Sequence, residues 1–530
     1  VMARELAVRA RQHQFVVMMA RSLPSLKSRI LQVAYSKKWI SKDDLDRVKV
    51  FEVKIQAAMA VNQPLKAIEL ALQVLALLGV NFPKALSQQV VGAELHAAVE
   101  EFAAYPVEDL LNLPEMTDPV DVAAMGVMNR IYSATYIAKP ELMILVSCRL
   151  ALLSLRKGNM PISSFAYSAF GLVLCGLVGD ISRGHRFGEL ALKVYDRYHL
   201  TQHKCRTYFM VNNFVWHWKR HLKETHKPLL ESYQSGLDTG ELEFAGYAAF
   251  IYTDYCLFAG KQLGELFEES GHYISAIDRI GQQTPLYYAQ IVGQTVQNLK
   301  GELSESPGLL SGKLYDELAM HNVHKEANDQ TALAFLYVHK LMLNYLFGNT
   351  SAALECAKEV ESYAGAITAM FHDTIYHFYA ALSICSAWPN LDDTQQQEFA
   401  SKLEQHREKL RVWSDNCPIN QQHKHLLVEA EWHRLNGEEA AARNAYKLAI
   451  ELAQNNEFLP EEALAYELAA KFWNGLGEIN IGELYAGHAH HRYQLWGAHA
   501  KVKQLEQELP VRTLSQGDSL SGTYSKTMSY

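Results

Sequence analysis

Apolar residues recur three and four positions apart along most of the chain, and no convincing run alternates as a strand would. The clearest stretch is residues 422–497, which predicts two helical hairpins. Small or flat residues lie five, nine and twelve positions after each turn glycine: Ala442, Tyr446 and Ala449 after Gly437, and Gly482, Ala486 and Ala489 after Gly477. Such positions share one helix face, so a second helix can approach it closely. The pattern indicates helix pairs that bury their apolar faces by stacking on neighbouring pairs.

The same offsets recur after other turns: Ala67, Ala71 and Val74 after Asn62; Gly184, Gly188 and Ala191 after Gly179; Ala353, Ala357 and Val360 after Gly348. They fail after Gly260, where they give Glu265, Glu269 and His272, so that hairpin is irregular or its register differs. The turn glycines lie at positions 179, 260, 348, 437 and 477, and their intervals indicate a period of about 40. Intervening turns are expected near His221, Ser304 to Gly308 and Pro389 to Asp393. We predict an all-α, TPR-like α-solenoid, a right-handed superhelix of antiparallel helix pairs.

Composition and pattern divide the chain into three segments. A chain of 530 residues exceeds the roughly 250–300 that one hydrophobic core usually serves, so we expect several domains or a repeat array. We assign residues 47–509 to the TPR-like helical-repeat domain. Residues 1–46 form a basic helical segment of uncertain assignment, with nine Lys and Arg against four acids. Residues 510–530 are rich in Ser, Thr and Gly and predict a flexible linker. Because the chain begins with Val inside a helical pattern, we expect it to be a piece of a longer protein.

Charge and cysteine usage narrow the class of protein. A net charge of −8 argues against general nucleic-acid binding. Seven scattered cysteines with no C-x-x-C pair favour a reduced, cytoplasmic location. The stretch between Lys157 and Asp180 carries no charge and is long enough to span a bilayer, but it includes Asn159, Pro161 and four glycines. A buried helix of the array explains it better, so we expect no membrane span.

Histidine clusters are the candidate chemistry. His217 and His221 lie four apart on a predicted helix, with His203 and Cys205 upstream. A zincin needs H-E-x-x-H, whereas Lys219 and Arg220 here would oppose a cation. Two other groups lack acids or cysteines nearby: His423 with His425, and His488 with His490 and His491.

The segment from Gly308 to Leu314 is one residue short of a P-loop and lacks its hydroxyl. From these motifs we expect no catalytic residue, no metal and no cofactor in this chain.

Aromatic residues mark the candidate binding surface. A stripe of them at helical spacing is more often core. The concave face of a solenoid is nevertheless where ligands and peptides usually bind. The first candidates for a ligand or partner groove are therefore Phe214, Trp216, His217, Trp218, His221, Tyr247, Phe250 and Tyr255.

Four phrases carry a resemblance to a known family: LLNLPEMTDP (110–119), FVWHWKRHL (214–222), EEALAYELAAKF (461–472) and WGAHAKV (496–502). They resemble the helical-repeat region of large bacterial hybrid signalling proteins, abundant in cyanobacteria. In that family a Ser/Thr kinase domain and an AAA/STAND-type ATPase precede this region, and a GAF domain and a sensor histidine kinase follow it. The resemblance covers roughly Asp46 to Pro510. Residues 1–45 depart from it, and Phe472-Trp473-Asn474 replaces an aromatic-Leu pair usual there.

The resemblance implies which domains flank this chain in a longer protein, and it assigns no catalytic residue to the chain itself. It leads us to expect a non-catalytic sensor and protein-interaction segment, which relays partner or ligand binding to attached ATPase, GAF and histidine kinase domains. A free-standing TPR-like regulator or scaffold is the first alternative. A metalloenzyme built on the histidine clusters is another. A regulator associated with DNA or membrane through residues 1–46 is the third.

Overall fold

The computed structural model describes residues 44–60, 63–198, 201–301 and 306–509. Within them the protein is all-α, with 23 α-helices and two isolated β-bridges in place of strands. Most of the predicted basic segment and the whole predicted linker lie outside the described residues. Asp44 to Asp46 belong to the first described helix, α3 (Asp44–Ala60).

The helices follow one another with short connections. The first third holds α4 (Pro64–Leu77), α5 (Gln88–Ala103), α6 (Pro119–Arg130), α7 (Tyr132–Ala138), α8 (Pro140–Lys157), α9 (Ser163–Val173) and α10 (Ile181–Tyr198). The middle holds α11 (Lys204–Phe214), α12 (His226–Thr239), α13 (Leu242–Phe258), α14 (Leu263–Arg279), α15 (Gln283–Lys300), α16 (Glu317–Glu326), α17 (Gln330–Leu346) and α18 (Thr350–Tyr363). The last third holds α19 (Phe371–Ala387), α20 (Asp393–Asn416), α21 (Pro418–Leu435), α22 (Glu439–Asn455), α23 (Leu459–Gly475), α24 (Ile479–Trp496) and α25 (His499–Glu508).

Short segments of other helix types separate some of these helices. One is π-helical, η2 (Leu174–Val178). The others are 3-10 turns: η1 (Val107–Asn112), η3 (Thr201–His203), η4 (Trp216–Trp218), η5 (Leu222–Thr225), η6 (Ala364–Ile367) and η7 (Trp388–Asn390).

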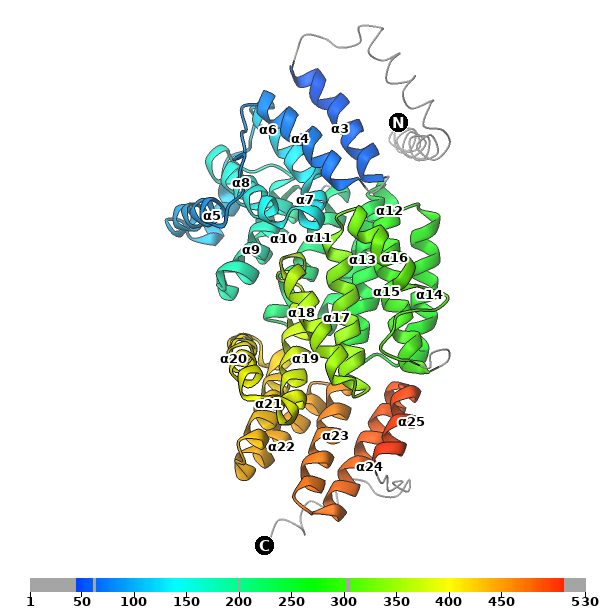
Figure 1. The fold of residues 1–530 in the computed structure, drawn as a ribbon. Helices are drawn as coiled ribbons and strands as arrows, with labels where there is room; N and C mark the ends of the chain where they lie inside the picture. Colours follow the sequence, from blue (N-terminus) through cyan, green and yellow to red (C-terminus); the bar gives the residue numbers. More distant parts are fainter. Residues whose placement is uncertain (1–43, 61–62, 199–200, 302–305, 510–530) are drawn as a thin grey trace.

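Helices that are neighbours in sequence pack together as pairs, as the small-residue faces predicted. The most extensive packing joins α3 to α4, α9 to α10, α11 to α12, α12 to α13, α14 to α15, α17 to α18, α20 to α21, α21 to α22 and α23 to α24. Figure 1 shows these pairs following one another from blue α3 at one end to red α25 at the other. Their apolar faces merge into one continuous core.

The turns repeat at a fixed interval in the last third. Backbone φ is positive at Gly437, Glu457, Gly477 and Gly497, which are evenly spaced along the chain. One helix with its turn occupies one such interval, and a pair occupies two, which is the predicted period. The predicted turn glycines 179, 260 and 348 also have positive φ, which glycine adopts without a Cβ clash. Turns near His221 and Pro389 exist as well, formed by η4 with η5 and by η7. In the third expected turn, Ser304 to Gly308, the described residues from Ser306 onward turn, with Leu309 N donating to the Ser306 carbonyl oxygen at 3.0 Å.

The predicted helix faces are buried. Ala442, Tyr446 and Ala449 are each at most 2% exposed. At Gly482, an added Cβ would meet Asn474 Oδ1 and lie 3.2 Å from the Ala470 carbonyl oxygen on the paired helix α23, so the small residue allows the two helices to approach closely.

The mismatch after Gly260 is a register difference of one residue. Helix α22 begins two residues after Gly437, whereas α14 begins three residues after Gly260. Leu266 and Ser270, six and ten residues on, are accordingly among the buried positions of α14. Of the two alternatives left by the sequence, the different register is therefore correct, because the turn is one residue longer.

The last pairs also contact the middle of the chain. His221 Nε2 lies 2.8 Å from the Asn456 carbonyl oxygen, and Lys223 Nζ lies 2.7 Å from Glu457 Oε2. The start of α25 packs against the turn at Gly301, where an added Cβ would lie 3.1 Å from Ala500. Contacts between such distant segments tie the array together along its length.

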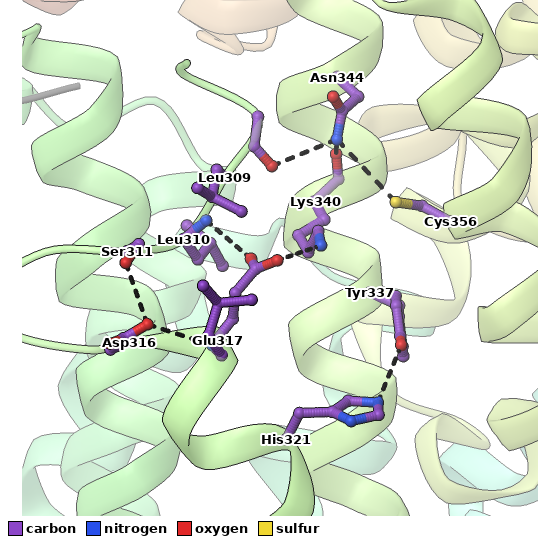
Figure 2. A network of polar contacts seen from close by, with 12 residues as sticks. Leu309, Leu310, Ser311, Asp316, Glu317, His321, Tyr337, Lys340, Asn344 and Cys356 are labelled. Atoms are coloured by element: carbon purple, nitrogen blue, oxygen red, sulfur yellow. Dashed lines mark hydrogen bonds and ion pairs between the residues drawn. The ribbon is translucent and has the colours of Figure 1, made fainter. Parts of the chain in front are cut away.

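The P-loop-like segment forms part of a closed polar network (Figure 2). Glu317 lies beneath it, accepting a hydrogen bond from Leu310 N at 2.8 Å and facing Lys340 Nζ at 2.5 Å. Asn344 donates to the Gly308 carbonyl oxygen at 3.3 Å. A carboxylate that accepts from the loop's own amide opposes phosphate binding there.

The uncharged stretch after Lys157 folds into α9 and η2. Among the described residues, no helix combines the length and the apolar character needed to cross a membrane.

Candidate functional site

The predicted groove residues lie in three different places. Trp218 borders a surface groove. Phe214, Tyr247 and Phe250 line an internal cavity, and His217 and Tyr255 lie beside a buried cluster of His and Asp side chains. The remaining two, Trp216 and His221, make packing contacts. All except His221 are buried, so most of these residues are part of the hydrophobic core. That they form a ligand or partner groove stays a prediction.

The groove lies between two parts of the chain that are far apart in sequence. One wall is η2 and the start of α10, residues 175–181, and the other is α20, residues 401–413. The rings of Trp218 and Trp413 meet beneath it, 5.1 Å apart. Its volume is about 750 Å³, which suits a ligand of drug size or a short peptide segment.

Apolar and charged groups both face this groove. Leu177 and Val178 on the η2 wall are about 40% exposed. Glu404, Glu408 and Lys409 come from the α20 wall. A second hollow of about 510 Å³ lies beside α18 and α19 and also borders α20. Helix α20 is therefore flanked by hollows.

The internal cavity is small and aromatic. Its volume is about 40 Å³, and its walls include Phe214, Tyr247, Phe250, Tyr288 and Phe335. That volume exceeds the roughly 10–15 Å³ that one water needs, but the lining is almost entirely apolar. A small neutral molecule fits this space better than an ion.

A cluster of ionisable side chains lies next to the cavity. Asp254 of α13, His339 of α17 and His372 of α19 are all fully buried. His339 Nε2 lies 3.3 Å from Asp254 Oδ1, and His372 Nε2 makes a short contact with Asp254 Oδ2. Phe335 joins the two regions, since its ring lies 4.4 Å from the His372 ring and also lines the cavity.

The electrostatics of the cluster favour an ionised Asp254. Burial raises the pKa of its carboxyl, but the charges of His372 and His339 and the hydrogen bond with His372 more than offset this and bring that pKa to about 2. Burial lowers the pKa of His372, and Asp254 opposes that shift. The neighbouring His217 has no such partner, and burial, with His372, lowers its pKa to about 3. His217 is thus neutral at pH 7.

The histidines singled out from the sequence do not form a common site. His217 lies in η4, and the chain leaves helical geometry before His221, so the two do not share a helix face as expected. His221 instead accepts from Lys223 N through Nδ1 and contacts Asn456 through Nε2.

The other singled-out histidines also have separate surroundings. His423 stacks near Phe458, and His490 lies 2.8 Å from Glu506. In the described parts of the chain, only Asp254, His339 and His372 bring three possible metal ligands within 4.8 Å of one another.

Sequence reasoning missed this cluster because its members come from three helices that are far apart along the chain. No local spacing marks such a group. The one signal was a single Asp in the otherwise uncharged run from Phe244 to Phe258. A lone acid in so apolar a helix needs a buried partner.

No protein-family model matches this chain, and a search of curated proteins finds no match either. The helix-pair packing is consistent with a helical repeat. The resemblance to bacterial signalling proteins therefore remains a hypothesis.

Proposed function

We propose that this chain is a non-catalytic sensor and protein-interaction segment of a multidomain signalling protein. In this proposal the helix pairs form a right-handed, TPR-like superhelix, and binding of a partner or small ligand is relayed to attached ATPase, GAF and histidine kinase domains. The resemblance in the four phrases supports the context. The evenly spaced helix pairs support the architecture, because stacked repeats present extended binding surfaces.

The proposal rests on one observation: the two walls of the groove come from parts of the chain that are far apart in sequence. Residues 175–181 and 401–413 are separated by many helix pairs, and both walls pack around α19, which adds Asp373 and His377 to the groove. The width of the groove therefore depends on how η2 and α20 pack against α19 and on the curvature of the pairs that bring them there. A ligand that fits one width better than another would favour the corresponding curvature. It can shift the equilibrium only by its difference in affinity for the two states. Domains attached at either end would then sense the change.

The test uses the complete protein, once the coding sequence on both sides of this segment has been read. Leu177→Asp places a charge on the groove wall, and Leu484→Asp, at a similarly exposed position on α24, is the matched control. We expect the first variant to change kinase autophosphorylation several-fold and the second to leave it unaltered. Equal activities in wild type and both variants would contradict the relay through the groove. A coding sequence without flanking catalytic domains would favour a free-standing scaffold.

A further inference from the structure

We propose that Asp254, His339 and His372 bind a divalent first-row transition metal ion in the centre of the helix array. Each residue comes from a different helix, α13, α17 or α19, and none of the three side chains is exposed. Both histidines direct Nε2 at the same carboxylate, one toward each oxygen. The three donor groups therefore lie within 4.8 Å of one another in the dry interior. This inference does not depend on the proposed signalling function.

The distance between His339 and Asp254 fits a bound ion better than a direct hydrogen bond. His339 Nε2 and Asp254 Oδ1 are 3.3 Å apart, yet neither atom has a hydrogen-bond partner among the described residues. Two ligand atoms that are each about 2.0–2.1 Å from a tetrahedral ion lie about 3.4 Å from one another. An ion between the two atoms would satisfy both. Without it, each buried unsatisfied group costs about 1–3 kcal/mol.

The donor set selects the class of metal. Two imidazole nitrogens and one carboxylate oxygen suit Zn²⁺ or Fe²⁺, whereas Mg²⁺ and Ca²⁺ prefer oxygen ligands alone. Binding would displace the proton that His372 and Asp254 hold between them. The Asp254 carboxylate offsets one of the two positive charges of the ion. The cysteines do not join the site, because the three-ligand group contains none.

Burial determines how the ion enters. Phe258 packs against both imidazole rings, with ring centroids 5.7 Å from His339 and 5.2 Å from His372, and the three ligand side chains are fully buried. We therefore expect the ion to bind as the chain folds. Once bound, it should resist chelators under native conditions and leave only on unfolding.

The test is metal content after expression in medium supplemented with Zn²⁺ and Fe²⁺, followed by native EDTA treatment. Wild type should retain about one ion per chain, and Asp254→Asn, His339→Gln and His372→Gln should each retain less than about 0.1. His217→Gln is the matched control, because His217 is buried with both ring nitrogens unpartnered but lies outside the cluster. It should retain the ion.

X-ray absorption of the wild type makes the test independent of whether the variants fold. It should show imidazole and oxygen scatterers without sulfur at about 2.0–2.1 Å. Three results would overturn the proposal: wild type without metal, variants that keep it, or sulfur in the coordination sphere. The first would identify the cluster as a proton-bridged ion pair.

Discussion

The C-terminal pairs and the centre of the molecule bury ionisable side chains in opposite ways. In α21 to α25 the buried charges have opposite charges within reach. Lys501 Nζ lies 2.9 Å from Glu467 Oε1, and Tyr493 donates to Glu467 Oε2 at 2.8 Å. Lys424, fully buried, lies 2.9 Å from Glu461. These contacts join α21 to α23, and α23 to α24 and α25.

The centre holds two imidazoles that have no hydrogen-bond partner at either nitrogen. Both ring nitrogens of His217 and of His339 lack hydrogen-bond partners among the described residues. Single unpartnered atoms also occur in α21 and α23, such as His423 Nδ1 and Glu461 Oε2, but each of these side chains has a partner at its other polar atom. A buried polar group is costly unless paired, so side chains without any hydrogen bond indicate a constraint other than stability. The comparison teaches that the C-terminal pairs serve as scaffold and that the centre is where a ligand is to be sought. Four predictions sharpen or break it.

The largest effect is expected for Glu467→Ala. The change leaves Lys501 buried at 1% exposure without its carboxylate, which should destabilise the protein by about 3–5 kcal/mol. Chemical denaturation measures the loss, and hydrogen exchange should locate it in α23 to α25. Glu404→Ala is the control, because Glu404 is exposed in its ion pair with Arg407 and should contribute less than about 1 kcal/mol. Similar losses in both variants would contradict the scaffold role.

The second prediction concerns pH. Burial lowers the pKa of His217 to about 3 and the pKa values of His226 and His324 to about 4, below the value near 6.5 of an unfolded chain. Between these values the unfolded chain binds protons that the folded chain does not. Stability should therefore fall as pH drops from about 6.5 toward 4, by about 1.4 kcal/mol per unit for each such histidine.

The Glu467 contacts of the C-terminal pairs should weaken in a different pH window. Burial raises the pKa of Glu467, but Lys501 and Lys471 outweigh it and lower that pKa to about 2. Its contribution is present above the unfolded value and is lost only as pH falls from about 4.5 to 2. Burial also lowers the pKa of His423 in α21 well below its ordinary value, so hydrogen exchange at pH 5 should show weakening around His217 and His423 and protection at the contact of Glu467 with Lys501. Loss of that contact already at pH 5 would break the comparison.

A smaller loss is expected for Tyr493→Phe. The variant removes one hydrogen bond to Glu467 but keeps the two lysines near that carboxylate. A cost of about 1 kcal/mol should appear in thermal denaturation. A cost as large as that of Glu467→Ala would mean that the hydroxyl, and not the lysines, holds the acid.

The smallest effect is expected for His217→Leu. The imidazole makes no hydrogen bond that the substitution could remove, so the free energy of unfolding at pH 7 should change by less than about 1 kcal/mol in thermal denaturation. The stability of the variant should also depend less steeply on pH. A loss of several kcal/mol would show that His217 binds a partner other than a protein group.

The helix pairs were predictable from sequence because their signal is local. Turn glycines and the small residues after them, such as Ala442 and Gly482, mark a turn and a close helix face within a dozen positions. The sequence does not mark the turn at Glu457, because a non-glycine residue adopts positive φ there. The phrase EEALAYELAAKF is distinctive in sequence, but its buried acids pair with Lys424 and Lys501, on other helices. Contacts between distant segments follow from the curvature of the whole array, which no local spacing encodes.

The contacts of His221 and Lys223 with residues 456 and 457 also have a mechanical consequence. They close the chain between them into a loop, so tension applied at the two ends of the array would load these contacts before it could stretch the pairs between them. Inserting or deleting one pair inside the loop would shift the meeting points out of register. The contact of Ala500 with the turn at Gly301 has the same effect on the pairs after residue 457, so the number of pairs is fixed on both sides of this closure.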